Sequence, residues 1–262
     1  MPAPPPYESI GVAVGADGIG RVTLRRSEKL NALSRAVLEE LTAAAAWFDE
    51  QDDVKVVVVA AEGPAFSAGF DLSDPRWAEL GPPERSTIVG RAMAEAVGGM
   101  RAVTVASIQG HCIGGGVVLA SACDLRVAAE GARFRIPEID LGIPLFWTGI
   151  PRLTRELGAA LTKELVLTGR TFDAAEAKTI RFVNRVVPDA ALAEATEALA
   201  AELAAKAAIV LRATKVQVEE AAPSVPEAVA GVDADEAGYV AAALDEEARD
   251  AARAYVRGLG RK

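Results

Sequence analysis

Three adjacent glycines, at residues 114–116, lie inside the segment GHCIGGGVVL (residues 110–119). The segment follows an apolar run at Val103–Ile108 and leads into an alanine-rich stretch, which predicts a strand, a tight turn and a helix start. Backbone N–H groups gather at a helix start, and glycine leaves them open to a ligand oxygen. The turn lacks the lysine of a phosphate-binding loop and the spacing of a dinucleotide-binding turn. It favours polarisation of a carbonyl oxygen; the alternative is a turn that only needs small residues.

A second candidate for chemistry is Glu138, which lies in a short turn among the apolar residues Ile136, Pro137 and Ile139. A carboxylate in such surroundings has a raised pKa and can exchange a proton near neutral pH. The alternative for an isolated glutamate in a turn is a solvated surface position. Other acids that could assist it, each more typical of a surface, are Asp140, Asp74, Glu79 and Glu84.

Charge and composition limit the possible partners. The net charge of −9 argues against nucleic acid and anionic membranes as partners. It leaves room for an anionic ligand where positive charge is local, as at Arg25, Arg26 and Lys29, although a solvated loop is the alternative there. One histidine and two cysteines, Cys112 and Cys123, are too few for a zinc site, and both cysteines are expected to be small buried residues.

Four segments taken together resemble the crotonase (enoyl-CoA hydratase/isomerase) superfamily. They are GRVTLRR with KLNAL (residues 20–33), FSAGFDL (residues 66–72), the glycine turn with CDLRVA (residues 110–128), and IPEIDLG (residues 136–142). Their order and spacing match the family over residues 10–190, and the rest matches loosely. The resemblance implies an α/β fold, a spiral of ββα units with a helical C-terminal trimerisation region, and acyl-CoA substrates.

The resemblance also implies roles for individual residues. The backbone N–H groups of Phe70 and Gly115 would form an oxyanion hole, and Glu138 would be the catalytic acid and base. Contacts to coenzyme A are implied for Arg26, Lys29, Ala32 and Ala68. The substrate pocket is implied to include Asp71, Leu72, Val118, Phe146 and Trp147. No cofactor is expected to stay bound, because coenzyme A arrives as part of the substrate, and no metal is expected.

Val118 departs from the hydratases of this family, which carry a second glutamate at that position. Two carboxylates help to hold the water that is added across a double bond, whereas moving a proton between C2 and C4 needs only one. The family's Δ3,Δ2-enoyl-CoA isomerases of the mitochondrial type are similar in having an aliphatic residue there. We therefore expect double-bond migration in an enoyl-CoA, with hydration of a 2-enoyl-CoA as the alternative and acyl-CoA binding without turnover as a third interpretation.

A serine hydrolase is a rival interpretation. The segment AFSAG (residues 65–69) nearly matches the G-x-S-x-G motif, and Ser67, Asp71 and His111 occur in the usual order. The first glycine is replaced by alanine, and the chain between Ser67 and His111 is too short for the strands that a hydrolase places there. We expect this interpretation to fail.

The surrounding pattern predicts the elements that position these residues. A hairpin is expected at Ile10–Val14 and Ile19–Leu24, a helix after Ser34, and a strand buried on both faces at residues 56–59. Alanine-rich helices are expected at residues 194–208, 211–221 and 236–255.

The same pattern predicts the organisation of the whole chain. Residues 1–6 are typical of a flexible leader, residues 7–190 of the acyl-CoA-binding core, and residues 191–262 of an oligomerisation region, giving a homotrimer or hexamer. No apolar run reaches the ~20 residues of a membrane span and no signal peptide pattern is present, so we expect a cytoplasmic protein.

Overall fold

A computed structural model describes residues 3–80, 85–222 and 232–259 of the 262-residue chain. The strands are β1 (Ile10–Val14), β2 (Ile19–Leu24), β3 (Val56–Ala61), β4 (Val103–Ile108), β5 (His111–Ile113), β6 (Leu125–Ala129), β7 (Arg133–Arg135), β8 (Phe172–Asp173) and β9 (Arg185–Val187). The α-helices are α1 (Arg35–Asp49), α2 (Arg85–Gly99), α3 (Gly115–Ala122), α4 (Gly149–Leu157), α5 (Ala159–Thr168), α6 (Ala174–Thr179), α7 (Leu192–Ala204), α8 (Ala208–Ala221), α10 (Val232–Leu244) and α11 (Glu246–Leu259). Short 3₁₀ helices are η1 (Ser27–Lys29), η2 (Pro75–Leu80), η3 (Glu138–Leu141) and η4 (Asp189–Ala191).

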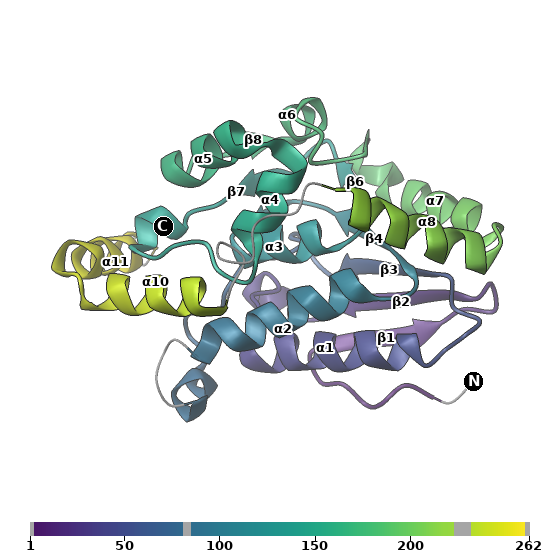
Figure 1. Ribbon diagram of the computed structural model, residues 1–262, viewed down its shortest axis with the longest axis horizontal. Coiled ribbons are helices and arrows are strands. Elements are labelled where there is room, and N and C mark those ends of the chain that lie inside the picture. Colours follow the sequence, from purple (N-terminus) through teal and green to yellow (C-terminus); the bar gives the residue numbers. More distant parts are fainter. Residues whose placement is uncertain (1–2, 81–84, 223–231, 260–262) are drawn as a thin grey trace.

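The main sheet has six strands in the order β1-β2-β3-β4-β6-β9. The predicted hairpin is confirmed, since β1 and β2 are antiparallel, and β2 then pairs in parallel with β3. The remaining pairs of this sheet are parallel as well, and the helices between the strands make the crossovers (Figure 1). The α/β class expected from the sequence is confirmed.

Strand β3 shows how the sheet separates two cores. Because side chains alternate across a strand, Val57 and Val59 pack into the core under α1, α2 and α3, whereas Val56 and Val58 pack against α7 on the other face. Helix α7 supplies Leu192 to that second core. The first helix of the C-terminal region is thus part of the sheet's own packing.

A second, three-stranded sheet carries the glycine turn, with strand order β5-β7-β8. Its strand β5 leads directly into α3, so the turn lies between a paired strand and a buried helix. The segment that follows β7 forms η3, which contains Glu138. The small sheet therefore supports both of the segments that the sequence marks for chemistry.

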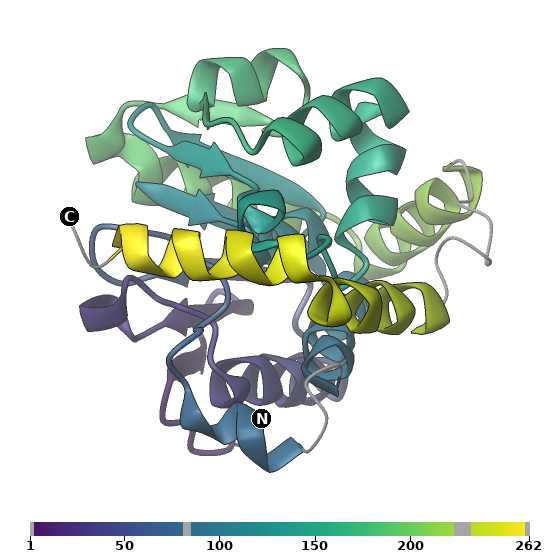
Figure 2. The ribbon, with the colours of Figure 1, turned by 90° about the vertical axis from the view of Figure 1, so that its left-hand side faces the viewer.

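The helices α10 and α11 form a pair that crosses the molecule next to η3 (Figure 2). One continuous helix over residues 236–255 was expected, but the chain breaks at Asp245, whose Oδ1 accepts a hydrogen bond from Ala248 N at 2.9 Å and so caps α11. A Cβ placed on Gly142 would lie 2.1 Å from the Ala248 carbonyl oxygen, so α11 packs closely on the end of η3. Within the described residues, no helix is long and apolar enough to cross a membrane.

Candidate active site

A cavity of about 350 Å³ lies where α3, η3, the segment before α4 and the C-terminal helix pair meet. Several residues singled out in the sequence line it, namely Phe70, Leu72, Gly115, Val118, Glu138, Phe146 and Trp147. Residues that the sequence analysis did not identify complete the lining: Ser86, Leu141, Ile143, Leu145, Tyr239, Ala252 and Val256. The structure therefore brings the marked segments together in one place.

The glycine turn presents an N–H group at the start of α3. Gly114 adopts φ +49° and ψ −114°, a conformation that side chains disfavour, and it precedes the first helical residue, Gly115. The N–H of a first helical residue has no partner inside the helix. The turn is held by its neighbours, since Gly114 N donates to Arg135 O at 2.9 Å. The Gly115 N–H is thus fixed in position at the cavity.

The N–H of Phe70 does not take part in the strand pairing next to it. Phe70 forms a parallel bridge with Leu33, and in such a bridge the hydrogen bonds pass through its neighbours. Leu33 N donates to Gly69 O at 2.7 Å, and Asp71 N donates to Leu33 O at 3.1 Å. The Phe70 N–H takes no part in this bridge.

The chain at Gly69, directly before Phe70, packs against the glycine turn. Gly69 has φ +87°, and a Cβ placed on it would lie 2.7 Å from Ile113 O and 3.4 Å from Gly115 N. Two fixed backbone donors beside one cavity are the arrangement that stabilises a developing oxyanion. Backbone N–H groups also do not titrate.

Glu138 is buried, with 9% of its surface exposed. Its Oε2 has no hydrogen-bond partner among the described residues, and desolvation raises the pKa of Glu138 to about 7. A Cβ on Gly114 would lie 2.4 Å from Glu138 Oε1, so only glycine leaves room for this carboxyl group. A buried carboxyl group with this pKa can both accept and return a proton at neutral pH.

Asp140 does not assist Glu138 in the structure. An extended segment would place both side chains on the same side, but the chain forms the 3₁₀ helix η3 and turns Asp140 away. Its carboxylate pairs with Arg135 at 2.6 Å. Arg135 in turn donates from Nε to Gly169 O at 2.7 Å.

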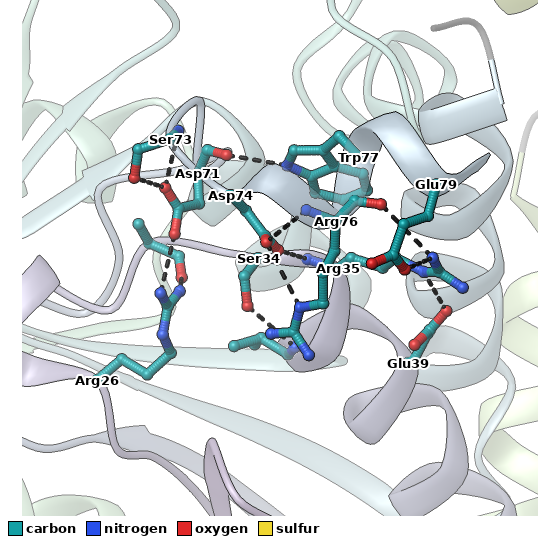
Figure 3. A network of polar contacts seen from close by, with 12 residues as sticks. Arg26, Ser34, Arg35, Glu39, Asp71, Ser73, Asp74, Arg76, Trp77 and Glu79 are labelled. Carbon is teal, nitrogen blue, oxygen red and sulfur yellow. Dashed lines mark hydrogen bonds and ion pairs between the residues drawn. The ribbon is translucent and has the colours of Figure 1, made fainter. Parts of the chain in front are cut away.

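Arg26 and Asp71 belong to a polar network beside the cavity (Figure 3). The Arg26 guanidinium pairs with Asp71 at 2.9 Å and donates to Ala32 O at 2.6 Å. Asp71 is 4% exposed and is not among the residues that line the cavity, contrary to the expectation from the sequence. This ion pair holds the chain next to Phe70, because Asp71 directly follows it.

Hydrogen bonds also fix the positions of Lys29 and Ala68, two further residues expected to contact coenzyme A. Lys29 is half-exposed and donates to Ser73 Oγ at 2.9 Å, so its ammonium group can reach solvent. Ala68 N donates to Leu30 O at 2.9 Å, which ties the segment before Phe70 to the loop that carries Lys29. A contact of Arg26, Lys29, Ala32 and Ala68 with coenzyme A stays a prediction.

The acids proposed as substitutes for a second glutamate have structural partners. Asp74 is buried and accepts a hydrogen bond from Arg35 N at 2.9 Å at the start of α1. Glu79, in η2, pairs with Arg35 at 3.1 Å (Figure 3). Glu84 lies outside the described residues. Within the described part of the chain, no group of three potential ligands could hold a metal ion.

The serine hydrolase interpretation has no support in the geometry. Ser67 is fully buried, and its hydroxyl donates to Asn31 O at 2.9 Å and accepts from Gly69 N at 3.1 Å. Asp71 is committed to Arg26, and the His111 side chain is exposed. The hydroxyl of Ser67 thus braces the loop before Phe70.

Trp147 enters the site in an unusual backbone conformation. Trp147 and Thr148 have φ of +62° and +59°, in the left-handed region that non-glycine residues seldom adopt. The indole ring covers two glycines, since a Cβ would lie 1.9 Å from it at Gly90 and 2.4 Å from it at Gly115. It also meets the Phe70 ring at 5.9 Å between centroids. Trp147 therefore packs against both residues that supply the N–H groups.

The sequence is similar to a known protein family and to individual members of it. The profile of a family described as Enoyl-CoA hydratase/isomerase matches residues 15–257. A probable enoyl-CoA hydratase of Mycobacterium bovis is 37% identical over 203 residues, covering 78% of this chain and 78% of that protein. The mitochondrial Delta(3,5)-Delta(2,4)-dienoyl-CoA isomerase of Rattus norvegicus is 32% identical over 225 residues, covering 81% of this chain and 69% of the isomerase.

Solved structures share the fold. An enoyl-CoA hydratase of Mycobacterium avium subsp. paratuberculosis has a TM-score of 0.85 at 22% identity, covering 95% of this chain and 99% of that chain. A protein of Thermobifida fusca, solved in complex with acetoacetyl-CoA, has a TM-score of 0.76 at 30% identity, covering 87% of this chain and 93% of that chain. With the profile match over most of its length, the chain belongs to the enoyl-CoA hydratase/isomerase family.

Proposed function

We propose that the protein acts on acyl-CoA thioesters and moves the double bond of an enoyl-CoA from Δ3 to Δ2. The observation that carries this proposal is the single carboxyl group, Glu138, among the described residues that line the cavity. The related protein of Thermobifida fusca, solved with acetoacetyl-CoA, supports a CoA thioester as the substrate.

In this reaction the backbone N–H groups of Phe70 and Gly115 donate hydrogen bonds to the thioester oxygen. They stabilise the negative charge that develops on it when the C2 proton leaves. Glu138 takes that proton, the electron pair forms the dienolate, and the same carboxyl group then delivers the proton to C4. The double bond ends between C2 and C3, and no other reactant is needed.

Hydration of a 2-enoyl-CoA is the second candidate. It is favoured by the names of the relatives, because several of those at 36–39% identity are named as probable enoyl-CoA hydratases. Hydration requires a held water molecule, and a second acid that would help to hold it is absent from the described lining. The position expected for that acid is occupied by Val118, which is 1% exposed.

The deciding experiment supplies a 3-enoyl-CoA and a trans-2-enoyl-CoA to the wild type under one condition. The proposal expects isomerisation to be much faster than hydration, and equal or faster hydration would contradict it. Binding of both thioesters without turnover would instead indicate a non-catalytic acyl-CoA binder.

Val118→Glu tests the reason for that preference. The added carboxyl group is expected to raise the ratio of hydration to isomerisation, although a buried carboxylate costs several kcal/mol unless its pKa rises. Val118→Met adds bulk without an acid and serves as the matched control. A ratio that rises equally in both variants would show that size, and not the acid, matters.

We also propose that the protein assembles as a homotrimer or hexamer. Helix α8 has no buried residue in the isolated chain, and it exposes the apolar residues Ile209, Val210, Val216 and Val218 by 54–74%. Exposed apolar surface of this kind marks interaction sites. Light scattering at micromolar concentration tests the proposal, and a monomer mass would contradict it.

A further inference from the structure

Two rings that come from distant parts of the chain meet in the wall of the cavity. Phe146 precedes α4 and Tyr239 belongs to α10, and their ring centroids lie 5.4 Å apart. Both rings line the same cavity. Tyr239 is partly exposed. The two rings therefore form one continuous part of the cavity wall.

The chemistry of the lining limits what the cavity can hold. Around the rings the wall is formed by aliphatic side chains, including Leu141, Ile143 and Val256. No lysine or arginine occurs among the described residues of the lining. Placing a carboxylate against such a wall removes its hydration without a compensating partner, which is strongly unfavourable. An uncharged hydrocarbon chain matches this wall.

The volume of the cavity sets a limit on length. Its 350 Å³ lies near the lower end of the ~300–1,000 Å³ that ligand pockets commonly enclose. That volume also contains the space beside Glu138 and Gly115 where the reacting atoms must lie. A long acyl chain would therefore need the space that Tyr239 and Phe146 occupy, or would have to leave the cavity.

We propose that Tyr239 determines acyl-chain specificity by narrowing the cavity against Phe146, so that the enzyme accepts uncharged acyl groups of short to medium length. The inference rests on the proposed acyl-CoA substrate. It is independent of whether the double bond migrates or is hydrated.

Binding of saturated acyl-CoA thioesters tests the inference without turnover. Calorimetry with butanoyl-, octanoyl- and hexadecanoyl-CoA should show that the wild type binds hexadecanoyl-CoA at least ~10-fold more weakly than octanoyl-CoA. Suberyl-CoA, which has the length of octanoyl-CoA and a terminal carboxylate, should also bind at least ~10-fold more weakly than octanoyl-CoA. If none of the thioesters binds, the proposed function itself fails.

Variants of Tyr239 then test the residue. Tyr239→Ala and the milder Tyr239→Leu should tighten hexadecanoyl-CoA binding relative to octanoyl-CoA by ~10-fold. Tyr239→Phe keeps the ring and should preserve the wild-type order of affinities, with octanoyl-CoA bound more tightly than hexadecanoyl-CoA. Val240→Ala, at the exposed neighbouring position of α10, is the matched control. Circular dichroism confirms folding of each variant. The inference is overturned if the wild type binds hexadecanoyl-CoA as tightly as octanoyl-CoA, or if folded Tyr239→Leu and Tyr239→Ala keep the wild-type order.

Discussion

The glycine turn before α3 and the C-terminal pair α10–α11 bound the same cavity, but they contribute to it in different ways. The turn is held by backbone hydrogen bonds on both sides, from Gly114 N to Arg135 O and from Ile113 N to Ser67 O, each at 2.9 Å. The helix pair contributes side chains to the lining, such as Tyr239 and Val256, the latter 55% exposed. Backbone geometry thus fixes the two N–H groups proposed as donors, whereas side chains form the wall of the proposed acyl space.

This comparison predicts that small changes in the turn have the largest effect. Gly114→Ala should lower kcat/KM by ~10³, because the added Cβ both disfavours the backbone conformation and lies 2.4 Å from the Glu138 carboxyl group. Steady-state kinetics with the preferred enoyl-CoA measures the loss. Gly99→Ala is the control, since a Cβ at Gly99 meets nothing within 4 Å, and it should stay within about two-fold of the wild type. A Gly114→Ala enzyme of normal activity would break the contrast between the two regions.

Removing the acid should have the next largest effect. Glu138→Gln keeps the shape of the side chain and removes the proton transfer, so turnover should fall by at least ~10² while acyl-CoA affinity stays within a few-fold. Separate measurements of kcat and of acyl-CoA binding check both parts. Asp140→Asn, whose carboxylate faces Arg135 instead, should retain most of the activity. If both variants were equally impaired, the distinction between the two carboxylates would be lost.

The buried Glu138 should also lower stability in a defined pH range. Its pKa rises from 4.5 in the unfolded chain to about 7 in the folded protein, so the folded state binds the proton more tightly. The free energy of unfolding of the wild type should therefore fall relative to Glu138→Gln as the pH rises from about 4.5 to 7, by up to about 3 kcal/mol. Urea denaturation of both proteins across this range measures the difference. A difference that does not change with pH would show that Glu138 titrates normally.

The ion pair beneath Phe70 should have the smallest effect. Asp71→Asn leaves the Arg26 guanidinium, 18% exposed, without its charged partner, so the free energy of unfolding should fall by about 2 kcal/mol. Because Asp71 directly follows Phe70, the substitution should also shift the Phe70 N–H group. This shift should lower kcat by about ten-fold with little change in KM. Ser73→Ala removes one hydrogen bond to Asp71 and keeps the ion pair, so it is the milder comparison. An effect on KM alone would place Asp71 in substrate binding instead.

Local patterns in the sequence were sufficient to predict the parts of the fold that depend on local structure. The four-valine run in β3 indicated a strand buried on both faces, and the glycines of the turn indicated open backbone donors. Glu138 could be singled out because apolar residues flank it, and its burial follows from the same neighbours.

Contacts between distant segments could not be predicted in this way. The pairing of Arg26 with Asp71 spans 45 positions, and nothing local indicates that the guanidinium is already committed. The packing of α11 on η3 likewise depends on tertiary contacts that an alanine-rich helix does not reveal. For Asp140 the local conformation was misjudged, because a 3₁₀ turn reverses the side chain direction that an extended segment would give. The break at Asp245 did have a local signal, since an aspartate followed by two glutamates is typical of a helix start.

The most direct test of the account follows the proton itself. If Glu138 alone carries the proton and is shielded from water, a 3-enoyl-CoA with two deuterium atoms at C2 should give a 2-enoyl-CoA that holds one of them at C4. Mass spectrometry or NMR after a single turnover in ordinary water locates the label. Deuterium at C4 is the predicted result. A product whose C4 carries only hydrogen taken up from the solvent would contradict a single buried acid and base.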